Sequence, residues 1–181
     1  SGSTMLIALV AGCMSPESTR PTDAANGAIP PAAAIVAARS TASVAHDADD
    51  PAVWISRTDP SKSLILGTDK AATVGALYVF DLAGHPIQKI APLDRPNNVD
   101  VEYGVAIGGQ PTDIAVVTER KQRRLRVFAI RPDGSGLDDL GASGIPVLSG
   151  QPGDAGEPMG IALYRRARDG ATFAIVSPKT G

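Results

Sequence analysis

An acidic segment near position 50 is the densest group of chemically active side chains in the chain. Asp47, Asp49 and Asp50 place three carboxylates within four positions, and Pro51 stiffens the backbone beside them. Such carboxylates repel one another unless a cation is present, and Ca²⁺ is bound by clustered carboxylate and carbonyl oxygens. One interpretation is a metal site. The other is a solvated acidic turn, or Asp47 capping a short helix.

A basic stretch, Arg120–Arg126, is the second group of chemically active side chains. Clustered cations can bind nucleic acid. Here, however, Arg124 and Arg126 alternate with Leu125 and Val127, which predicts a strand with one apolar face and one solvent-exposed face. The net charge of −2 provides no overall basic field. We therefore predict that nucleic acid is not a partner.

Other motifs of catalytic chemistry are missing from the sequence. His46 and His85 are far apart, so no zinc-binding pattern is present. There is no nucleophile elbow, phosphate-binding P-loop or dinucleotide-binding fingerprint. Asn97, Asn98 and Asp100 are typical of a turn stabilised by Asx side chains.

The elements that must position these groups are short strands. From position 44 onward, β-branched or aromatic runs recur between turn residues, and no segment has a sustained apolar period of 3.6 residues. This pattern predicts an all-β fold; a sandwich, a barrel and propeller blades all fit it, and no strong internal repeat selects one. The expected strands are Ala52–Ile55, Ser63–Gly67, Ala76–Leu82, Pro86–Ala91, Thr112–Thr118, Arg124–Ile130, Gly160–Arg165 and Thr172–Ser177.

The beginning of the chain resembles the end of an export signal. Met5–Cys13 is an apolar run that is too short to span a bilayer and ends in small residues. Its last four residues, Val10–Cys13, match a bacterial lipobox, which predicts a lipid anchor on Cys13. Ser1–Thr4 lacks the basic residues of a complete signal, and a short buried apolar segment is the alternative. Cys13 is the single cysteine, so no intramolecular disulfide forms within these residues.

Residues 14–40 differ in composition from both neighbours. They are rich in Ala, Pro, Ser and Thr and have few large apolar side chains, which predicts a flexible tether. An Ala-rich helix at Ala32–Ala38 is the alternative. We therefore divide the chain into a signal remnant (1–13), a linker (14–40) and a β domain (41–181). The protein is expected to be secreted, or held in the periplasm or at the outer membrane as a lipoprotein.

Residues 44–181 resemble the calcium-dependent β-propeller phytases, a 3-phytase family. Asp47–Trp54, with the sequence Asp-Ala-Asp-Asp-Pro-Ala-Val-Trp, is similar to the motif that opens the catalytic domain of that family. The order of the further matches is more specific than any one of them. They are Gly67–Lys70, Ala76–Leu82, Arg95–Tyr103, Asp113–Arg120, Gly156–Tyr164 and Ala174–Lys179. The resemblance implies about the first half of a six-bladed β-propeller.

The resemblance also implies a reaction and a cofactor. The reaction is calcium-dependent hydrolysis of phosphomonoesters of phytate (myo-inositol hexakisphosphate), in which a metal-activated water releases inorganic phosphate. Asp49 aligns with a carboxylate of the active-site calcium cluster. Asp50, with the carbonyls of Pro51 and Val99, aligns with a stabilising calcium site. The resemblance places Asn97, Asn98 and Asp100 near that site rather than in an Asx-rich turn. Without the resemblance, each residue is also compatible with ordinary solvated surface.

Three cations align with side chains that contact substrate phosphates in that family: Lys70, Arg120 and Lys179. An arginine offers paired donors to phosphate, whereas lysine acts as a compact charge. Two residues depart from the family pattern. Met159 stands where some members have a substrate-facing tyrosine, and Thr180 stands where an acidic residue follows the lysine. One hydroxyl contact and one calcium ligand are therefore in doubt.

The domain of the resembling family is considerably longer than residues 41–181. We expect the 181-residue chain alone to have weak or no activity, and to self-associate through open blade edges. An alternative is a non-catalytic, calcium-stabilised propeller that binds phosphorylated ligands or a partner protein. A third interpretation is a β-rich envelope lipoprotein whose acidic loop binds calcium only for stability.

Overall fold

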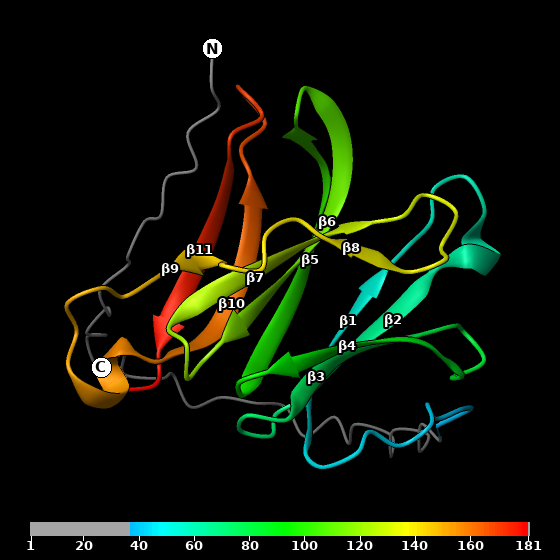
Figure 1. Cartoon of the computed structure of the whole chain (residues 1–181). Helices are drawn as coiled ribbons and strands as arrows, with labels where there is room; N and C mark the ends of the chain where they lie inside the picture. Colours follow the sequence, from blue (N-terminus) through cyan, green and yellow to red (C-terminus); the bar gives the residue numbers. More distant parts are fainter. Residues whose placement is uncertain (1–36, 181) are drawn as a thin grey trace, which may run out of the picture.

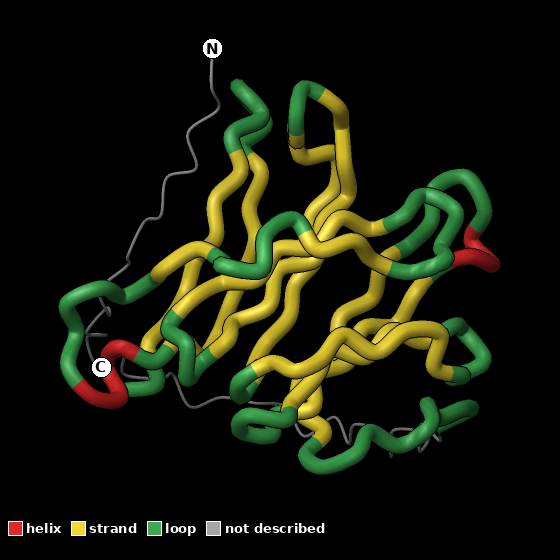
Figure 2. The backbone as a smooth tube through the Cα atoms, viewed as in Figure 1, coloured by secondary structure: helices red, strands yellow, loops and turns green. Residues whose placement is uncertain are grey.

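The computed structural model describes residues 37–180 and consists of antiparallel sheets (Figures 1 and 2). The only helical segments in these residues are two short 3₁₀ turns, η1 (Pro60–Lys62) and η2 (Gly153–Gly156). The strands are β1 (Ala48–Trp54), β2 (Leu64–Asp69), β3 (Gly75–Phe80), β4 (Pro86–Leu93), β5 (Pro96–Ile107), β6 (Gln110–Glu119), β7 (Arg124–Ile130), β8 (Leu137–Asp139), β9 (Ile145–Pro146), β10 (Pro158–Arg165) and β11 (Thr172–Pro178).

The strands pair in the order in which they occur in the chain. The first sheet is β1-β2-β3-β4, the second is β5-β6-β7-β8 with β9 also paired to β7, and the third is β10-β11. The first strands of the three sheets, β1, β5 and β10, lie next to one another, with β5 in the middle (Figure 1). The all-β prediction is confirmed, and these sequential meanders fit part of a propeller. The number of six blades and the division into 1–13, 14–40 and 41–181 stay predictions.

The apolar core lies between successive sheets. Trp54, Leu77 and Val79 of the first sheet pack against Phe128 and Ile130 of the second. On the opposite face of the second sheet, a separate cluster packs against the third. It contains Val105, Val116, Leu125, Val147, Ala174 and Val176. The middle sheet is thus buried on both faces.

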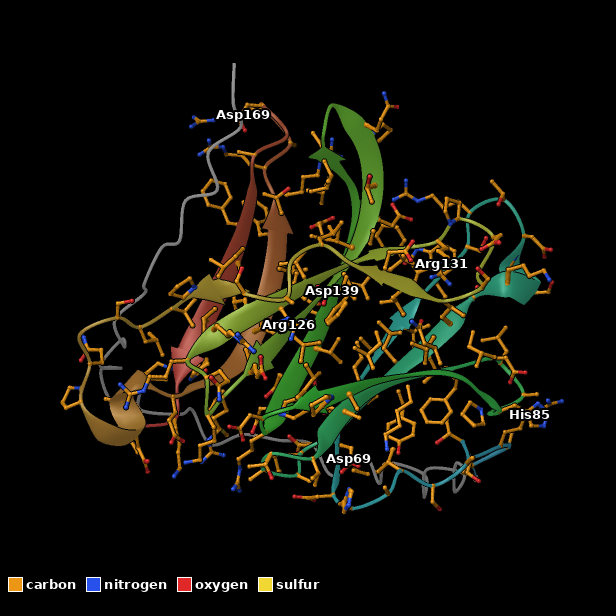
Figure 3. All side chains as sticks on the ribbon, in the orientation of Figure 1. Asp69, His85, Arg126, Arg131, Asp139 and Asp169 are labelled. Atoms are coloured by element: carbon orange, nitrogen blue, oxygen red, sulfur yellow. The ribbon has the colours of Figure 1, made fainter. Side chains whose placement is uncertain are left out.

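The prediction of one solvent-exposed face for β7 was wrong. Arg126 lies on the same face as Phe128 and Ile130, toward the first sheet, and is only 6% exposed. Its guanidinium binds Asp139 of β8 at 2.5 Å, and the two residues are labelled side by side in Figure 3. Acids of the same sheet therefore neutralise the arginines, which allows a basic strand face to be covered by a neighbouring blade.

The longest strand, β5, was missed, and it contains Asn97, Asn98 and Asp100, for which an Asx-rich turn was one of two interpretations. Two register shifts, between Pro96 and Val99 and between Glu102 and Val105, interrupt its pairing with β6. Such bulges break the alternation that reveals strands in a sequence. Polar residues are tolerated because neighbouring sheets bind them: Asp100 Oδ2, for example, accepts the Leu163 amide of β10 at 2.7 Å.

The signal remnant, the proposed lipid anchor on Cys13 and most of the proposed tether lie outside the described residues. Within residues 37–180, no helix has the length and apolarity that a membrane crossing requires.

Candidate functional site

A three-residue pattern ends the second strand of each sheet: a hydroxyl residue, any residue, then a cation. The pattern is Thr68–Lys70 at the end of β2, Thr118–Arg120 at the end of β6 and Ser177–Lys179 at the end of β11. Each hydroxyl oxygen accepts a backbone amide of the first strand of its own sheet, from Asp50 at 3.0 Å, Asn98 at 2.9 Å and Gly160 at 3.1 Å. The three sequence-predicted cations therefore occupy equivalent positions in successive blades.

The backbone hydrogen bonds of the three cations are also equivalent. The backbone amide of each cation donates to the carbonyl of the residue that directly precedes the first strand of the same sheet. These carbonyls belong to Asp47 (2.7 Å to Lys70), Arg95 (3.2 Å to Arg120) and Glu157 (2.9 Å to Lys179). An internal repeat is thus present, although sequence analysis found no strong one. The tripeptides Thr-Asp-Lys and Thr-Glu-Arg were its signal.

Two of the hydroxyls also bind the next sheet. Thr68 Oγ1 donates to the Asn97 carbonyl of β5 at 2.8 Å. Thr118 Oγ1 donates to the Met159 carbonyl of β10 at 3.0 Å. Both threonines are fully buried. Each therefore joins two blades at the end of the sheets where the cations emerge.

Lys70 is held by an acid of its own sheet. Its Nζ donates to Asp49 Oδ1 at 2.6 Å and lies 4.0 Å from Asp47 Oδ2. About a quarter of each side chain of the Lys70–Asp49 pair is exposed. The structure therefore brings two predicted site residues, Lys70 and Asp49, into direct contact.

Asp69, between Thr68 and Lys70, is buried beneath this pair. Burial opposes its ionisation, but the Asp47 amide at 2.8 Å and His46 Nδ1 at 2.9 Å both bind its carboxylate. These hydrogen bonds outweigh burial and lower the pKa of Asp69. The acidic segment is thus anchored to the first sheet through a buried carboxylate (labelled in Figure 3).

Arg120 is buried and is held by an acid of the next sheet. Its Nε donates to Glu157 Oε2 at 2.7 Å, and Lys121 Nζ donates to Glu157 Oε1 at 2.5 Å. Despite burial, the Lys121 and Arg120 hydrogen bonds lower the pKa of Glu157 to about 2. Glu157 therefore stays ionised and fixes two cations from the β6–β7 turn.

Lys179 pairs with Asp154 of η2, with Nζ 2.5 Å from Oδ2, and both side chains are partly exposed. The η2 loop is held in place by Arg123, whose guanidinium donates to the carbonyls of Gln151 and Gly153 at 3.0 Å each. Arg120 and Lys179 are therefore connected through one short segment, residues 151–157.

Backbone hydrogen bonds also connect Lys70 to Arg120. The Arg95 amide donates to the carbonyl of Ala71, which follows Lys70, at 3.0 Å. The Arg95 carbonyl accepts the Arg120 amide at 3.2 Å. Together with residues 151–157, this chain of contacts places all three cations along one end of the sheets. We call this end, comprising Lys70, Arg95, Arg120, Glu157 and Lys179, the cationic rim.

The residues predicted to bind metal lie beside this rim. Asp50 Oδ2 accepts the Val99 amide at 3.0 Å, so Asp50 and Val99 are adjacent across β1 and β5. Pro51 is exposed and pairs with Gly67 in the β1–β2 register. Their roles as calcium ligands stay predictions.

The described residues supply only part of what a calcium ion requires. Ca²⁺ takes six to eight oxygen ligands. Within residues 37–180, no group of three or more His, Cys, Asp or Glu side chains could hold a metal ion. Asp49 and Asp50 offer carboxylate oxygens, but these residues do not form a complete calcium site by themselves.

Sequence analysis missed two residues of the rim, Glu157 and Arg95. Both lie inside motifs that were recognised, and their position opposite a cation in the repeat could have revealed them. The two departures from the family pattern are also located. Met159 contributes its carbonyl to Thr118, and Thr180 is exposed next to Lys179.

The rim can bind an anion by exchanging partners. Its cations are bound to carboxylates, and a phosphate group offers the same oxygen acceptors with more charge. The exposed pairs of Lys70 and Lys179 can open at low cost, since exposed ion pairs contribute little free energy. The buried Arg120–Glu157 pair is a fixed support.

Comparison with known proteins shows the family to which the chain belongs. A family model described as Phytase matches residues 3–181. The chain is 31% identical over 136 residues to a protein of Bacillus subtilis (strain 168) named 3-phytase. That alignment covers 74% of this chain and 34% of the relative, so the chain spans about a third of the length of the curated relative it matches. Because the family model covers nearly the whole sequence, the chain belongs to the Phytase family, as the resemblance of residues 44–181 predicted.

Proposed function

We propose that the protein is an enzyme, a phosphatase that hydrolyses phosphomonoesters of inositol hexakisphosphate. The observation that carries this proposal is the repetition of a cation at one place in three successive sheets, Lys70, Arg120 and Lys179. A substrate with several phosphate groups can contact several such positions at once. Membership of the Phytase family and similarity to a 3-phytase support the same reaction.

The residues of the rim have separate roles in this proposal. Lys70 and Lys179 exchange their exposed carboxylate partners for phosphate oxygens. Arg120 is oriented by Glu157 and directs donors toward a phosphate group along a fixed line, which lowers the entropic cost of binding. Thr68 and Thr118 hold neighbouring blades in register, so the spacing between the cations does not vary.

We propose Ca²⁺ as the cofactor, with Asp49 and Asp50 supplying some of its ligands and the remaining oxygens coming from outside residues 37–180. When bound, the ion neutralises phosphate charge and lowers the pKa of water. Asp49 would then exchange Lys70 for the metal, because both compete for the same carboxylate. The Lys70 ammonium would then be available to bind a substrate phosphate.

A second candidate function is binding of phosphorylated ligands without hydrolysis. It is favoured by the incomplete set of carboxylates in residues 37–180, and by Met159 and Thr180 at positions where the family pattern has a tyrosine and an acid. Weak or no turnover by the isolated chain, self-association through open edges, and export as a lipoprotein through Cys13 remain part of the proposal.

Isothermal titration calorimetry and phosphate release separate the two functions. We expect the chain to bind inositol hexakisphosphate, and calcium to raise the rate of phosphate release by a longer protein that contains it. Replacing Lys70 with Ala should weaken binding roughly tenfold, because one charge-assisted contact is lost.

The control is Arg168→Ala, which removes one positive charge in the β10–β11 turn, at the other end of the third sheet from Lys179. Binding without phosphate release from the longer protein, with or without calcium, would favour the second function. Equal affinity for the Lys70 variant, the Arg168 variant and the unaltered chain would exclude the cationic rim as the binding site.

A further inference from the structure

Arg95 occupies an unusual place in the repeat. The residue opposite the cation is Asp47 in the first sheet and Glu157 in the third, both acids. In the second sheet this residue is Arg95, and its carbonyl accepts the amide of Arg120. Two like charges directly across a pair of strands repel each other. The second blade therefore has a cation where its neighbours have a carboxylate.

The carboxylates near Arg95 are engaged elsewhere. Asp94 binds the Thr73 amide at 2.9 Å and the Gln122 side chain at 2.9 Å. Glu157 already holds Arg120 and Lys121. Among residues 37–180, Arg95 has no ion pair, whereas Lys70, Arg120 and Lys179 each have at least one. Glu157 thus binds two cations, Arg120 and Lys121, and Arg95 adds a third cation that no carboxylate of residues 37–180 pairs with.

The side chain and backbone of Arg95 both carry an unfavourable feature. Its Nε is buried without a hydrogen-bond partner in the described residues, which costs free energy unless a ligand supplies an acceptor. Its φ is +58°, a left-handed conformation that is uncommon for a residue other than glycine. Strained backbone of this kind is often found at binding sites. Within residues 37–180, no hydrogen bond or ion pair of this guanidinium compensates for these features.

We propose that Arg95 and Arg120 form a subsite for one phosphate group of the substrate. The Arg95 guanidinium supplies donors that no acid of the described chain satisfies, and Arg120, oriented by Glu157, supplies the opposing donors. This inference rests on the proposed function, because it assigns a further residue to the same rim. The excess of positive charge at this point selects a doubly charged phosphate over a carboxylate.

Arg95→Asn is the informative variant. Asn accepts the left-handed conformation more readily than Arg, so the variant keeps the backbone while removing the guanidinium. With inositol hexakisphosphate as the probe, in calcium-free buffer, we expect calorimetry to give affinity roughly tenfold weaker than that of the unaltered chain. The melting temperature without the probe should be unchanged or higher, because strain and like-charge repulsion are removed.

The matched control is Arg168→Asn, which removes the same charge from the distant β10–β11 turn and should leave affinity unchanged. Arg95→Gly also relieves the backbone and repeats the test if the Asn variant folds poorly. Unchanged affinity in the Arg95 variants, or a fall equal to that of the Arg168 control, would overturn the assignment. So would the absence of binding by the unaltered chain.

The outcome is separable from that of the proposed function. If the unaltered chain binds the probe and the Arg95 variants bind it more weakly, the subsite stands even when the longer protein releases no phosphate. If the longer protein releases phosphate and the Arg95 variant binds and reacts equally well, only the subsite fails.

Discussion

Lys70 and Arg120 occupy the same place in two successive blades but are held in different ways. Lys70 binds Asp49, an acid of its own sheet, and both side chains are partly exposed. Arg120 binds Glu157, an acid that leads into the next sheet, and both side chains are buried. The backbone contacts of the two positions are the same, so burial and the source of the carboxylate account for the difference.

This difference separates a cation that is held in one orientation from a cation that can exchange its carboxylate partner. A buried ion pair costs much to break, because the remaining charge is left without a partner in a low-dielectric setting. An exposed pair contributes about 0–1 kcal/mol and exchanges partners easily. In the cationic rim, the second blade therefore holds its cation, Arg120, in a fixed orientation, and the first blade offers a cation and a carboxylate that can exchange their partners.

Of the variants that test this comparison, Glu157→Gln should change the free energy of unfolding most. The amide keeps the shape of the side chain but leaves Arg120 buried without a counter-charge, so we expect a loss of about 3 kcal/mol in the free energy of unfolding. Denaturant unfolding measures it. Asp154→Asn, in the same loop, breaks only the exposed pair with Lys179 and should cost less than about 1 kcal/mol.

The same variant predicts a pH dependence. Hydrogen bonds from Lys121 and Arg120 lower the pKa of Glu157 from 4.5 to about 2. The contribution of Glu157 to stability is therefore present above pH 4.5 and is lost as the pH falls toward 2. The difference between the unaltered chain and Glu157→Gln should therefore shrink across that window. A difference that stays constant from pH 7 to pH 3 would show that the charge of Glu157 is not what stabilises Arg120.

Thr118→Val and Thr68→Val should have smaller effects that resemble each other. Each removes a hydroxyl that accepts an amide of its own sheet and donates to a carbonyl of the next. Leaving these buried groups without a partner costs about 1–3 kcal/mol. Thermal unfolding of both variants, with half-exposed Thr112→Val as the control, measures the cost. A large loss in one variant alone would break the structural equivalence of the two blades.

The strands and turns of this fold were largely predictable because apolar alternation and glycine-containing turns are local signals. Arg124 and Arg126 show that the local sequence does not determine which face of a strand is buried. Their alternation with Leu125 and Val127 correctly indicated a strand, but whether a neighbouring blade covers the basic face depends on residues far away in the chain. The strand β5 was missed for a related reason, since its polar residue Asp100 is bound by the backbone of another sheet.

The site was predictable only in part. The resemblance selected Lys70, Arg120 and Lys179, and the structure places them at equivalent positions of one rim. It could not show that Glu157 binds Arg120, because the partner of a buried charge lies 37 positions away. Nor could it single out Arg95, whose interest depends on what stands opposite it and on the absence of a partner within residues 37–180.

Asp49→Asn should have the smallest effect on stability and the clearest effect on metal response. Without calcium, the variant loses only the partly exposed contact with Lys70, so the free energy of unfolding should change by less than about 1 kcal/mol. We propose that calcium competes with Lys70 for this carboxylate. Adding calcium should therefore raise the melting temperature of the unaltered chain more than that of the variant. Asp59→Asn, an exposed acid in the loop before η1, should respond to calcium like the unaltered chain. Equal calcium responses in all three proteins would mean that Asp49 serves only to hold Lys70. The first blade would then not exchange its carboxylate between Lys70 and calcium.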